Sequence, residues 1–79
     1  MKTTRYFEEQ VIRKRPYLQL NWISDAIADP LRREIQVDGR FRCWKQVTDI
    51  RGQNRYLRVI VLEDGLTVHN AFFDRDFRE

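Results

Sequence analysis

The first third of the chain places its apolar residues at helical spacing. Over residues 3–16, "TTRYFEEQVIRKRP", Phe7 and Val11 lie four positions apart and therefore share one helix face. Thr4 stands where an N-cap is expected, acidic residues precede basic ones, and Pro16 cannot continue a helix. These signals predict a helix that begins near Thr4 and ends before Pro16.

A second apolar stripe follows in "LNWISDAIADP", residues 20–30. Its members recur at the helical period, which predicts a helix with one face directed to the core. The stripe consists of Trp22, Ile23, Ala26 and Ile27. Pro30 ends the segment, so the second predicted helix is short.

After the second helix the apolar period changes to that of β-strands. Four segments show it: 33–37, 40–48, 54–63 and 66–73. Asp38-Gly39 and Asp64-Gly65 predict two-residue type I′ turns, which need positive φ at both central residues. A looser polar connection at 49–54 joins the two hairpins. The predicted fold class is α+β, with two N-terminal helices packed on one face of a four-stranded antiparallel β-meander in a single domain.

A two-residue loop at Asp64-Gly65 also fixes which residues of the last two strands face each other. It pairs Ile60 with His69 and Arg58 with Ala71. The predicted helix-covered face, interrupted only by Asn70, carries Leu57, Val59, Val61, Leu66, Val68 and Phe72. The opposite, mixed face carries Tyr56, Arg58, Ile60, Leu62, Thr67, His69, Ala71 and Phe73.

In the first hairpin the same rule pairs Ile35 with Arg42 and Arg33 with Trp44. Apolar and basic residues therefore share a face there. We expect three residues of this hairpin to join the mixed face: Arg40, Arg42 and Trp44.

The bulk composition is that of one small folded domain, with 79 residues, 42% of them hydrophobic and 13% aromatic. No apolar run approaches the ~20 residues of a membrane helix, and no signal-peptide core begins the chain. We therefore expect a cytoplasmic protein with no membrane partner. A lone Cys43 and a single histidine form no ligand cluster, so neither a metal site nor a cofactor is predicted.

The charged residues point to a polyanionic partner. The formal net charge is only +3, but twelve of the 15 basic residues are arginines. A guanidinium group pairs with phosphate through two hydrogen bonds and stacks on bases, which suits RNA. A solvated basic surface would give the same count.

His69 is the one candidate for proton transfer. A histidine beside arginines can move a proton while a ribose 2′-hydroxyl attacks its own phosphate. The competing interpretation is a polar residue on a half-exposed strand, hydrogen-bonded to a neighbour or to water. Trp44 and Tyr56 likewise either stack on bases or pair with neighbours across the strands. Residues 74–76 are predicted to form a solvated turn.

Four stretches of the chain carry a family resemblance. They are "RKRPY", "ADPLRREIQVDGRFRCW", "RYLRVIVLEDG" and "TVHNAFFDRDF", and they span about Arg13 to Phe77. They resemble a family of short, uncharacterised bacterial proteins that is similar to toxin ribonucleases of the RelE and BrnT type. Such toxins cut RNA without a metal ion and are silenced by a protein antitoxin.

The resemblance implies roles for individual residues. It makes His69 and Arg58 the candidate catalytic pair. The candidate substrate contacts are Arg13, Arg15, Arg42, Tyr56 and Arg75. The chain departs from RelE proteins in lacking a lysine-rich helix face, and a net charge of +3 is lower than is usual in these toxins.

Three functions follow as alternatives. The first is a toxin-like, metal-independent endoribonuclease controlled by an antitoxin. The second is a non-catalytic module that binds RNA or a protein through the same sheet face. The third is a homodimer that buries the apolar residues of the mixed face: Tyr56, Ile60, Leu62 and Phe73.

Overall fold

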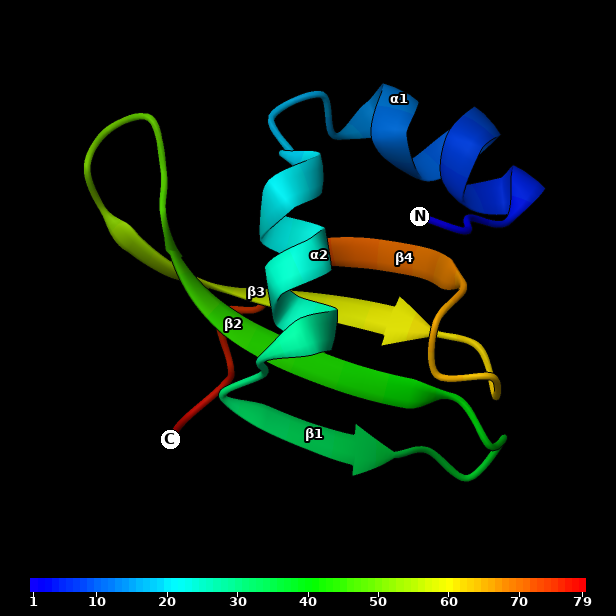
Figure 1. Ribbon diagram of the computed structural model, residues 1–79. Helices are drawn as coiled ribbons and strands as arrows, with labels where there is room; N and C mark the ends of the chain where they lie inside the picture. Colours follow the sequence, from blue (N-terminus) through cyan, green and yellow to red (C-terminus); the bar gives the residue numbers. More distant parts are fainter.

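The computed structural model describes residues 1–79 and shows two short helical segments above a four-stranded antiparallel sheet (Figure 1). The strands lie in the order β1-β2-β3-β4, so each pairs with its neighbour in sequence. The elements are η1 (Phe7–Val11), α1 (Ile12–Lys14), α2 (Leu20–Ala28), β1 (Arg32–Ile35), β2 (Phe41–Thr48), β3 (Asn54–Val61) and β4 (Val68–Phe73). The predicted α+β class is confirmed. No helix is long and apolar enough to span a membrane.

The first helical segment begins where the sequence predicts. The Phe7 N–H donates to the Thr4 hydroxyl at 3.1 Å, which satisfies one of the free amides at the helix start. Phe7 and Val11 are both buried, so they form its core-facing side. The π-helical turn η1 continues into α1, and the backbone leaves helical geometry at Arg15, next to Pro16.

The second helix, α2, also follows its apolar stripe. Ile23 and Ala26 are fully buried, and Trp22 and Ile27 pack against them from the side. The helix ends at Ala28, before Pro30, as predicted.

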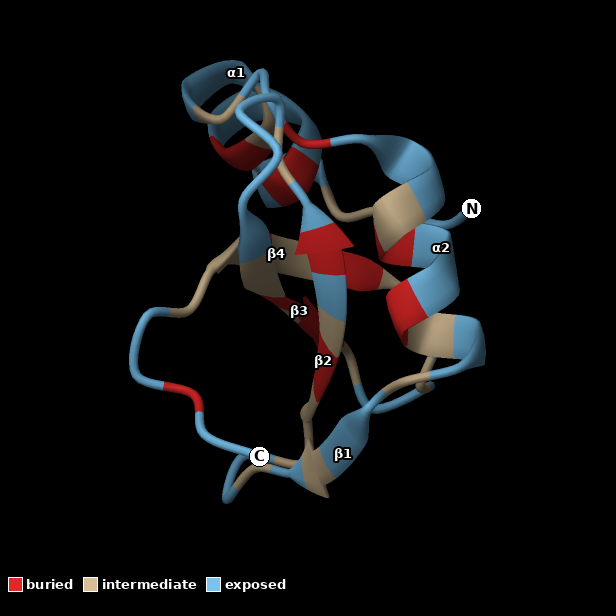
Figure 2. Cartoon of the chain, turned by 90° about the vertical axis from the view of Figure 1, so that its left-hand side faces the viewer, coloured by how far each residue is buried: buried red, intermediate tan, exposed pale blue.

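A single hydrophobic cluster joins the helices to one face of the sheet. Buried residues gather where the helical segments and the strands face each other (Figure 2). The cluster consists of 11 residues: Phe7, Val11, Leu18, Ile23, Ala26, Val47, Leu57, Val59, Val61, Val68 and Ala71. Helix propensity alone would not hold segments this short, so burial against the sheet stabilises them.

The turn at Asp38-Gly39 is wider than predicted. The Gly39 N–H donates to the Gln36 carbonyl and the Gln36 N–H to the Arg40 carbonyl, which closes a three-residue loop. Only Gly39 has positive φ, so the type I′ prediction was wrong. The wider loop also moves the pairing by one residue.

In the observed first hairpin, Ile35 lies opposite Phe41 and Arg33 opposite Cys43, so the predicted pairs were wrong. Arg32 is the residue opposite Trp44.

The second hairpin keeps its predicted pairing only near the turn. The Leu62 N–H donates to the Thr67 carbonyl, and Val61 lies opposite Val68, as predicted. A register shift then follows between Ile60 and Val61, so that one extra residue, His69, is accommodated in β4.

The bulge reverses the predicted faces of β4 from Asn70 onward. Ile60 lies opposite Asn70, Arg58 opposite Phe72, and Leu57 opposite Phe73, each one residue away from the predicted partner. Because side chains alternate between faces, Ala71 and Phe73 move to the helix side and Phe72 moves to the mixed face. The predicted core residue Leu66 is also 60% exposed, so that assignment was wrong.

Contacts with the N-terminal segment accompany the bulge. The Val68 N–H donates to the Lys2 carbonyl, and the Thr4 N–H donates to the Val68 carbonyl, each at 2.9 Å. Residues 2–4 therefore cover the outer edge of β4 and hold it where the bulge occurs.

Candidate nucleic-acid interface

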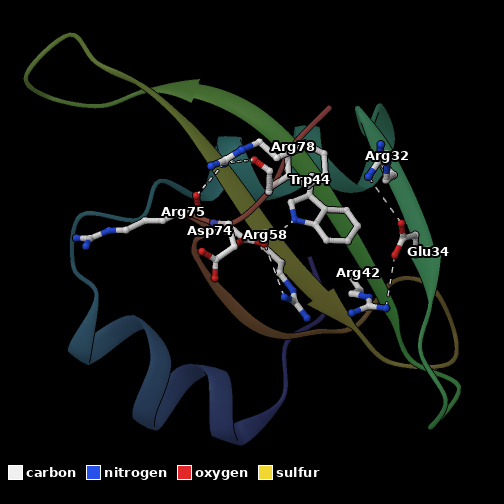
Figure 3. A network of polar contacts seen from close by, with 10 residues as sticks. Arg32, Glu34, Arg42, Trp44, Arg58, Asp74, Arg75 and Arg78 are labelled. Carbon is white, nitrogen blue, oxygen red and sulfur yellow. Dashed lines mark hydrogen bonds and ion pairs between the residues drawn. The ribbon is translucent and has the colours of Figure 1, made fainter.

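The side of the sheet opposite the helices carries a row of residues that crosses all four strands. Trp44 lies opposite Arg32 on one side and Arg58 on the other, and Arg58 lies opposite Phe72. Neighbouring residues in such a row point to the same face. We call this side the arginine face, defined by Arg32, Arg42, Trp44, Arg58 and Phe72 together with Arg15, whose guanidinium group reaches Phe72 from the segment after α1. Figure 3 shows Arg32, Arg42, Trp44 and Arg58 of this face.

Guanidinium groups and aromatic rings alternate on the arginine face. The Arg58 Cζ lies 5.6 Å from the centre of the Trp44 ring and 5.4 Å from that of Phe72. The Arg42 Cζ lies 5.9 Å from Trp44, and the Arg15 Cζ lies 6.0 Å from Phe72. These distances are those of cation–π contacts, which hold the charged groups in place.

The ion pairs of this face are loose. Arg58 Nη1 lies 3.7 Å from Asp74 Oδ2, and Arg42 Nη2 lies 3.5 Å from Glu34 Oε1. The Nε atoms of both arginines are buried without a hydrogen-bond partner. Their side chains remain 26% and 34% exposed, so hydrogen-bonding capacity is left for an anion at the surface.

Asp74 anchors the segment that follows β4. Its carboxylate accepts the Trp44 Nε1–H at 2.9 Å and the Asp76 N–H at 3.0 Å. The Trp44 hydrogen bond is the largest cause of the lowered pKa of Asp74, and the positive charge of Arg58 adds to it. The carboxylate is therefore ionised at neutral pH and fixes the indole between the two arginines.

The C-terminal tail, residues 74–79, covers part of the arginine face. Figure 2 shows it on the side of the sheet away from α2. The Phe77 ring stacks on Trp44 at 4.9 Å and meets Tyr56 edge-on at 4.9 Å, while the Arg32 guanidinium lies 5.0 Å above it. The Tyr56 O–H donates to the Glu79 carboxylate, which raises the pKa of the phenol. Tyr56, a predicted substrate contact, is thus occupied within the chain.

His69 is held by the N-terminal segment. Its Nδ1 lies 3.0 Å from the Thr4 hydroxyl, and its ring stacks on Tyr6 at 4.9 Å. Desolvation, followed by the positive charge of Arg40, lowers the pKa of His69. The ring is therefore neutral at pH 7. Its contacts are with Thr4 and Tyr6, and the predicted proximity to Arg58 depended on a register that the bulge removes.

The remaining predicted residues lie at different places. Arg15 joins the arginine face from the segment after α1. Arg13 is exposed and lines a shallow groove with Arg5, Glu8 and Glu9. Arg75 is exposed and points away from the cluster in Figure 3. The structure therefore brings together Arg15, Arg42, Arg58 and Tyr56, but neither Arg13 nor Arg75.

Four residues of the site and its tail escaped the sequence interpretation. Phe72 was assigned to the core and Asp74 to a solvated turn, while Arg32 and Phe77 were assigned to no element. An isolated aromatic residue beyond the last strand was the one available signal for the tail, because a large apolar side chain seeks burial.

The chain matches no family model, no curated protein and no solved structure. No group of three His, Cys, Asp or Glu side chains is arranged to hold a metal ion.

Proposed function

We propose that the protein is a toxin-like, RNA-directed protein that binds single-stranded RNA on the arginine face. The observation that carries the proposal is the gathering of Arg15, Arg42 and Arg58 around two aromatic rings. Single-stranded RNA offers phosphates to guanidinium groups and unstacked bases to aromatic and guanidinium planes.

Phe72 is the ring best placed to receive a base. It is only partly buried, and both the Arg58 and the Arg15 guanidinium groups lie within 6.0 Å of its ring centre. Trp44, in contrast, is buried under Phe77 and serves to position the arginines. A nucleotide would stack at Phe72 while its flanking phosphates meet the two arginines.

The layout of the domain adds support. Two helical segments on one face of an antiparallel meander, with a basic opposite face, form the arrangement that the resemblance to RelE and BrnT toxins implies. We include a relation to those toxins in the proposal, and with it control by a protein antitoxin.

RNA cleavage is a second candidate, and the state of His69 favours it. Its lowered pKa leaves the ring neutral, so a ring nitrogen can accept a proton from a 2′-hydroxyl. His69 lies three residues before Phe72 on β4, a distance of roughly 10 Å along a strand. An RNA held at Phe72 that runs along β4 would reach His69, which would act as the base, while Arg58 would hold a phosphate next to Phe72 and not the one that is attacked.

Fluorescence anisotropy with a labelled, mixed-sequence single-stranded RNA tests the binding proposal. Arg58→Gln and Arg42→Gln should each weaken binding on the order of tenfold, because each removes one charged phosphate contact. The matched control is Arg51→Gln, an exposed arginine in the loop between β2 and β3. Equal losses in all three variants, or no binding by the wild type at low salt, would refute the proposal.

Cleavage is tested separately by incubating the same RNA with protein and EDTA. Fragments ending in a 2′,3′-cyclic phosphate that disappear with His69→Ala would establish a catalytic histidine. Intact RNA with a protein that still binds it would leave the binding function and remove the catalytic one.

A further inference from the structure

The outer edge of β1 is the free edge of the sheet. Strand β4 is covered at its edge by the N-terminal segment, where Thr3 forms a parallel bridge with Val68. Strand β1 has no such neighbour and forms the lower border of the sheet in Figure 1. Unpaired edges are ready to accept another strand.

The free backbone groups of β1 belong to alternate residues. The Gln36 N–H bonds to the Arg40 carbonyl, and Glu34 lies opposite Arg42 in β2. Because hydrogen bonding alternates along an antiparallel pair, Glu34 directs its backbone groups to β2, while Arg33 and Ile35 direct theirs outward. An incoming strand would therefore bond to Arg33 and Ile35.

The sequence of this edge is complementary to itself. Residues 31–35 read "LRREI", in which apolar ends enclose a basic and an acidic residue around the central Arg33. Antiparallel pairing of two copies about Arg33 sets Arg32 opposite Glu34 and Leu31 opposite Ile35 across the interface. We propose that a second copy of this chain pairs through β1, so that two sheets join into one.

The backbone at Arg33 and the charges of its neighbours agree on this register. The Leu31 N–H already donates to the Trp44 carbonyl at 2.7 Å, so the central hydrogen bonds come from Arg33. Arg33 would face its own counterpart as a hydrogen-bonded pair, and both members of such a pair carry outward-facing groups. The Arg32–Glu34 pairs then occupy non-hydrogen-bonded positions, where side chains approach most closely. Within one chain these two residues form only a 4.0 Å contact, and the ion pair of Glu34 with Arg42 is loose at 3.5 Å, so both side chains keep hydrogen-bonding capacity for the second copy.

The positive charge of Arg33 does not oppose the pairing, although the two Arg33 residues lie opposite each other at the centre of the interface. Its guanidinium lies over the Phe41 ring at 4.2 Å, on the neighbouring strand and away from the edge. It reaches as far as the β3–β4 loop, where a Cβ added at Gly65 would meet Arg33 Nη2 at 3.0 Å. The two positive charges therefore point apart rather than toward each other.

Exposed apolar surface accompanies the free edge. Leu31 and Ile35 are 47% and 65% exposed. Pairing of two copies would cover both, which adds a hydrophobic contribution to the hydrogen bonds and ion pairs. It would also bring the two arginine faces to one side of the joined sheet, although the pairing does not depend on RNA binding.

Sedimentation velocity over a concentration series tests the pairing. The wild type should show a reversible monomer–dimer equilibrium. Arg33→Pro removes an outward N–H without removing a bond to β2, and Pro is tolerated at such an edge position. It should weaken the dimer at least ~10-fold, because the central hydrogen-bonded pair is lost. Arg33→Ala is the control and should dimerise as the wild type does, with circular dichroism confirming that both variants fold.

A charge exchange provides the second arm. Arg32→Glu and Glu34→Arg should each weaken the dimer, because like charges would then face each other across the interface. The double exchange should restore much of the affinity. A wild type that stays monomeric at all concentrations would overturn the proposal. A dimer that survives Arg33→Pro and both single exchanges would also overturn it, since the contact would then lie elsewhere.

Discussion

Replacing Phe77 by alanine tests whether the C-terminal tail holds the arginine face in place. The Phe77 side chain is only 6% exposed although it belongs to no helix or strand. It contacts Trp44, Tyr56 and the Arg32 guanidinium. The substitution removes these contacts at once and releases the tail from the sheet.

The expected loss of stability is about 2–3 kcal/mol. Burial of a Phe side chain contributes roughly 1.5–3 kcal/mol. Each aromatic pair adds about 0.5–1.5 kcal/mol, and an exposed cation–π contact about 0.5–1 kcal/mol. The backbone of the one or two residues around position 77 regains entropy worth roughly 1 kcal/mol per residue, which offsets part of the loss. The net value therefore lies below the ~3–5 kcal/mol of a Phe→Ala change in a fixed core.

Urea unfolding followed by tryptophan fluorescence measures the change. With a urea m-value of about 1 kcal/mol/M, the midpoint should fall by ~2 M. Arg75→Ala, an exposed change in the same tail, should alter the unfolding free energy by less than ~0.5 kcal/mol. A Phe77→Ala protein as stable as the Arg75→Ala protein would refute the packing described for the tail.

Three further predictions concern the edge of β4 and the turns. Thr4→Ala should lower the unfolding free energy by about 1 kcal/mol in urea titrations, because the Phe7 N–H loses its cap. Lowering the pH below 6.5, the ordinary pKa of histidine, should reduce the unfolding free energy, because His69 in the unfolded chain then binds more protons than in the folded one. Just above pH 6.5 the unfolding free energy should be constant, and His69→Gln should remove the pH dependence. Gly65→Ala should lower the stability measured by thermal unfolding more than Gly52→Ala does. Both glycines have positive φ, +72° and +80°, so alanine costs roughly 1–2 kcal/mol at either position. Only at Gly65 does the new Cβ also meet another side chain, that of Arg33.

Both helical segments could be predicted from the sequence because their signals are local. The Thr4 cap, the buried pair Phe7 and Val11, and the stops before Pro16 and Pro30 all depend on residues a few positions apart. Such signals act in the same way in almost any tertiary context, so they transfer directly from the sequence to the structure.

The turn positions were predictable but the turn types were not. A glycine at positive φ is needed both in a type I′ turn and in the wider loops observed, so Asp-Gly does not distinguish between them. The difference is one residue of register, and in a strand one residue exchanges the two faces. This explains why Ile35 and Arg33 have partners other than the predicted ones.

The β4 bulge lies beyond local prediction because the contacts that accompany it come from residues distant in sequence. The Lys2 carbonyl and the Thr4 hydroxyl meet β4 only after the chain has folded back on itself. The same holds for Phe77, whose partners lie on β2 and β3. The candidate site was therefore recovered where it depended on β2 and β3 and missed where it depended on β1, β4 and the tail.

The central claim is that the arginine face binds RNA through its guanidinium groups, and the salt dependence of binding tests it most directly. The affinity for single-stranded RNA should fall with increasing salt, with a logarithmic slope of about −2 for three phosphate contacts. Arg58→Gln should reduce the magnitude of the slope by about 0.7, and Arg51→Gln should leave it unchanged. A slope near zero, or one that Arg58→Gln does not alter, would contradict the account.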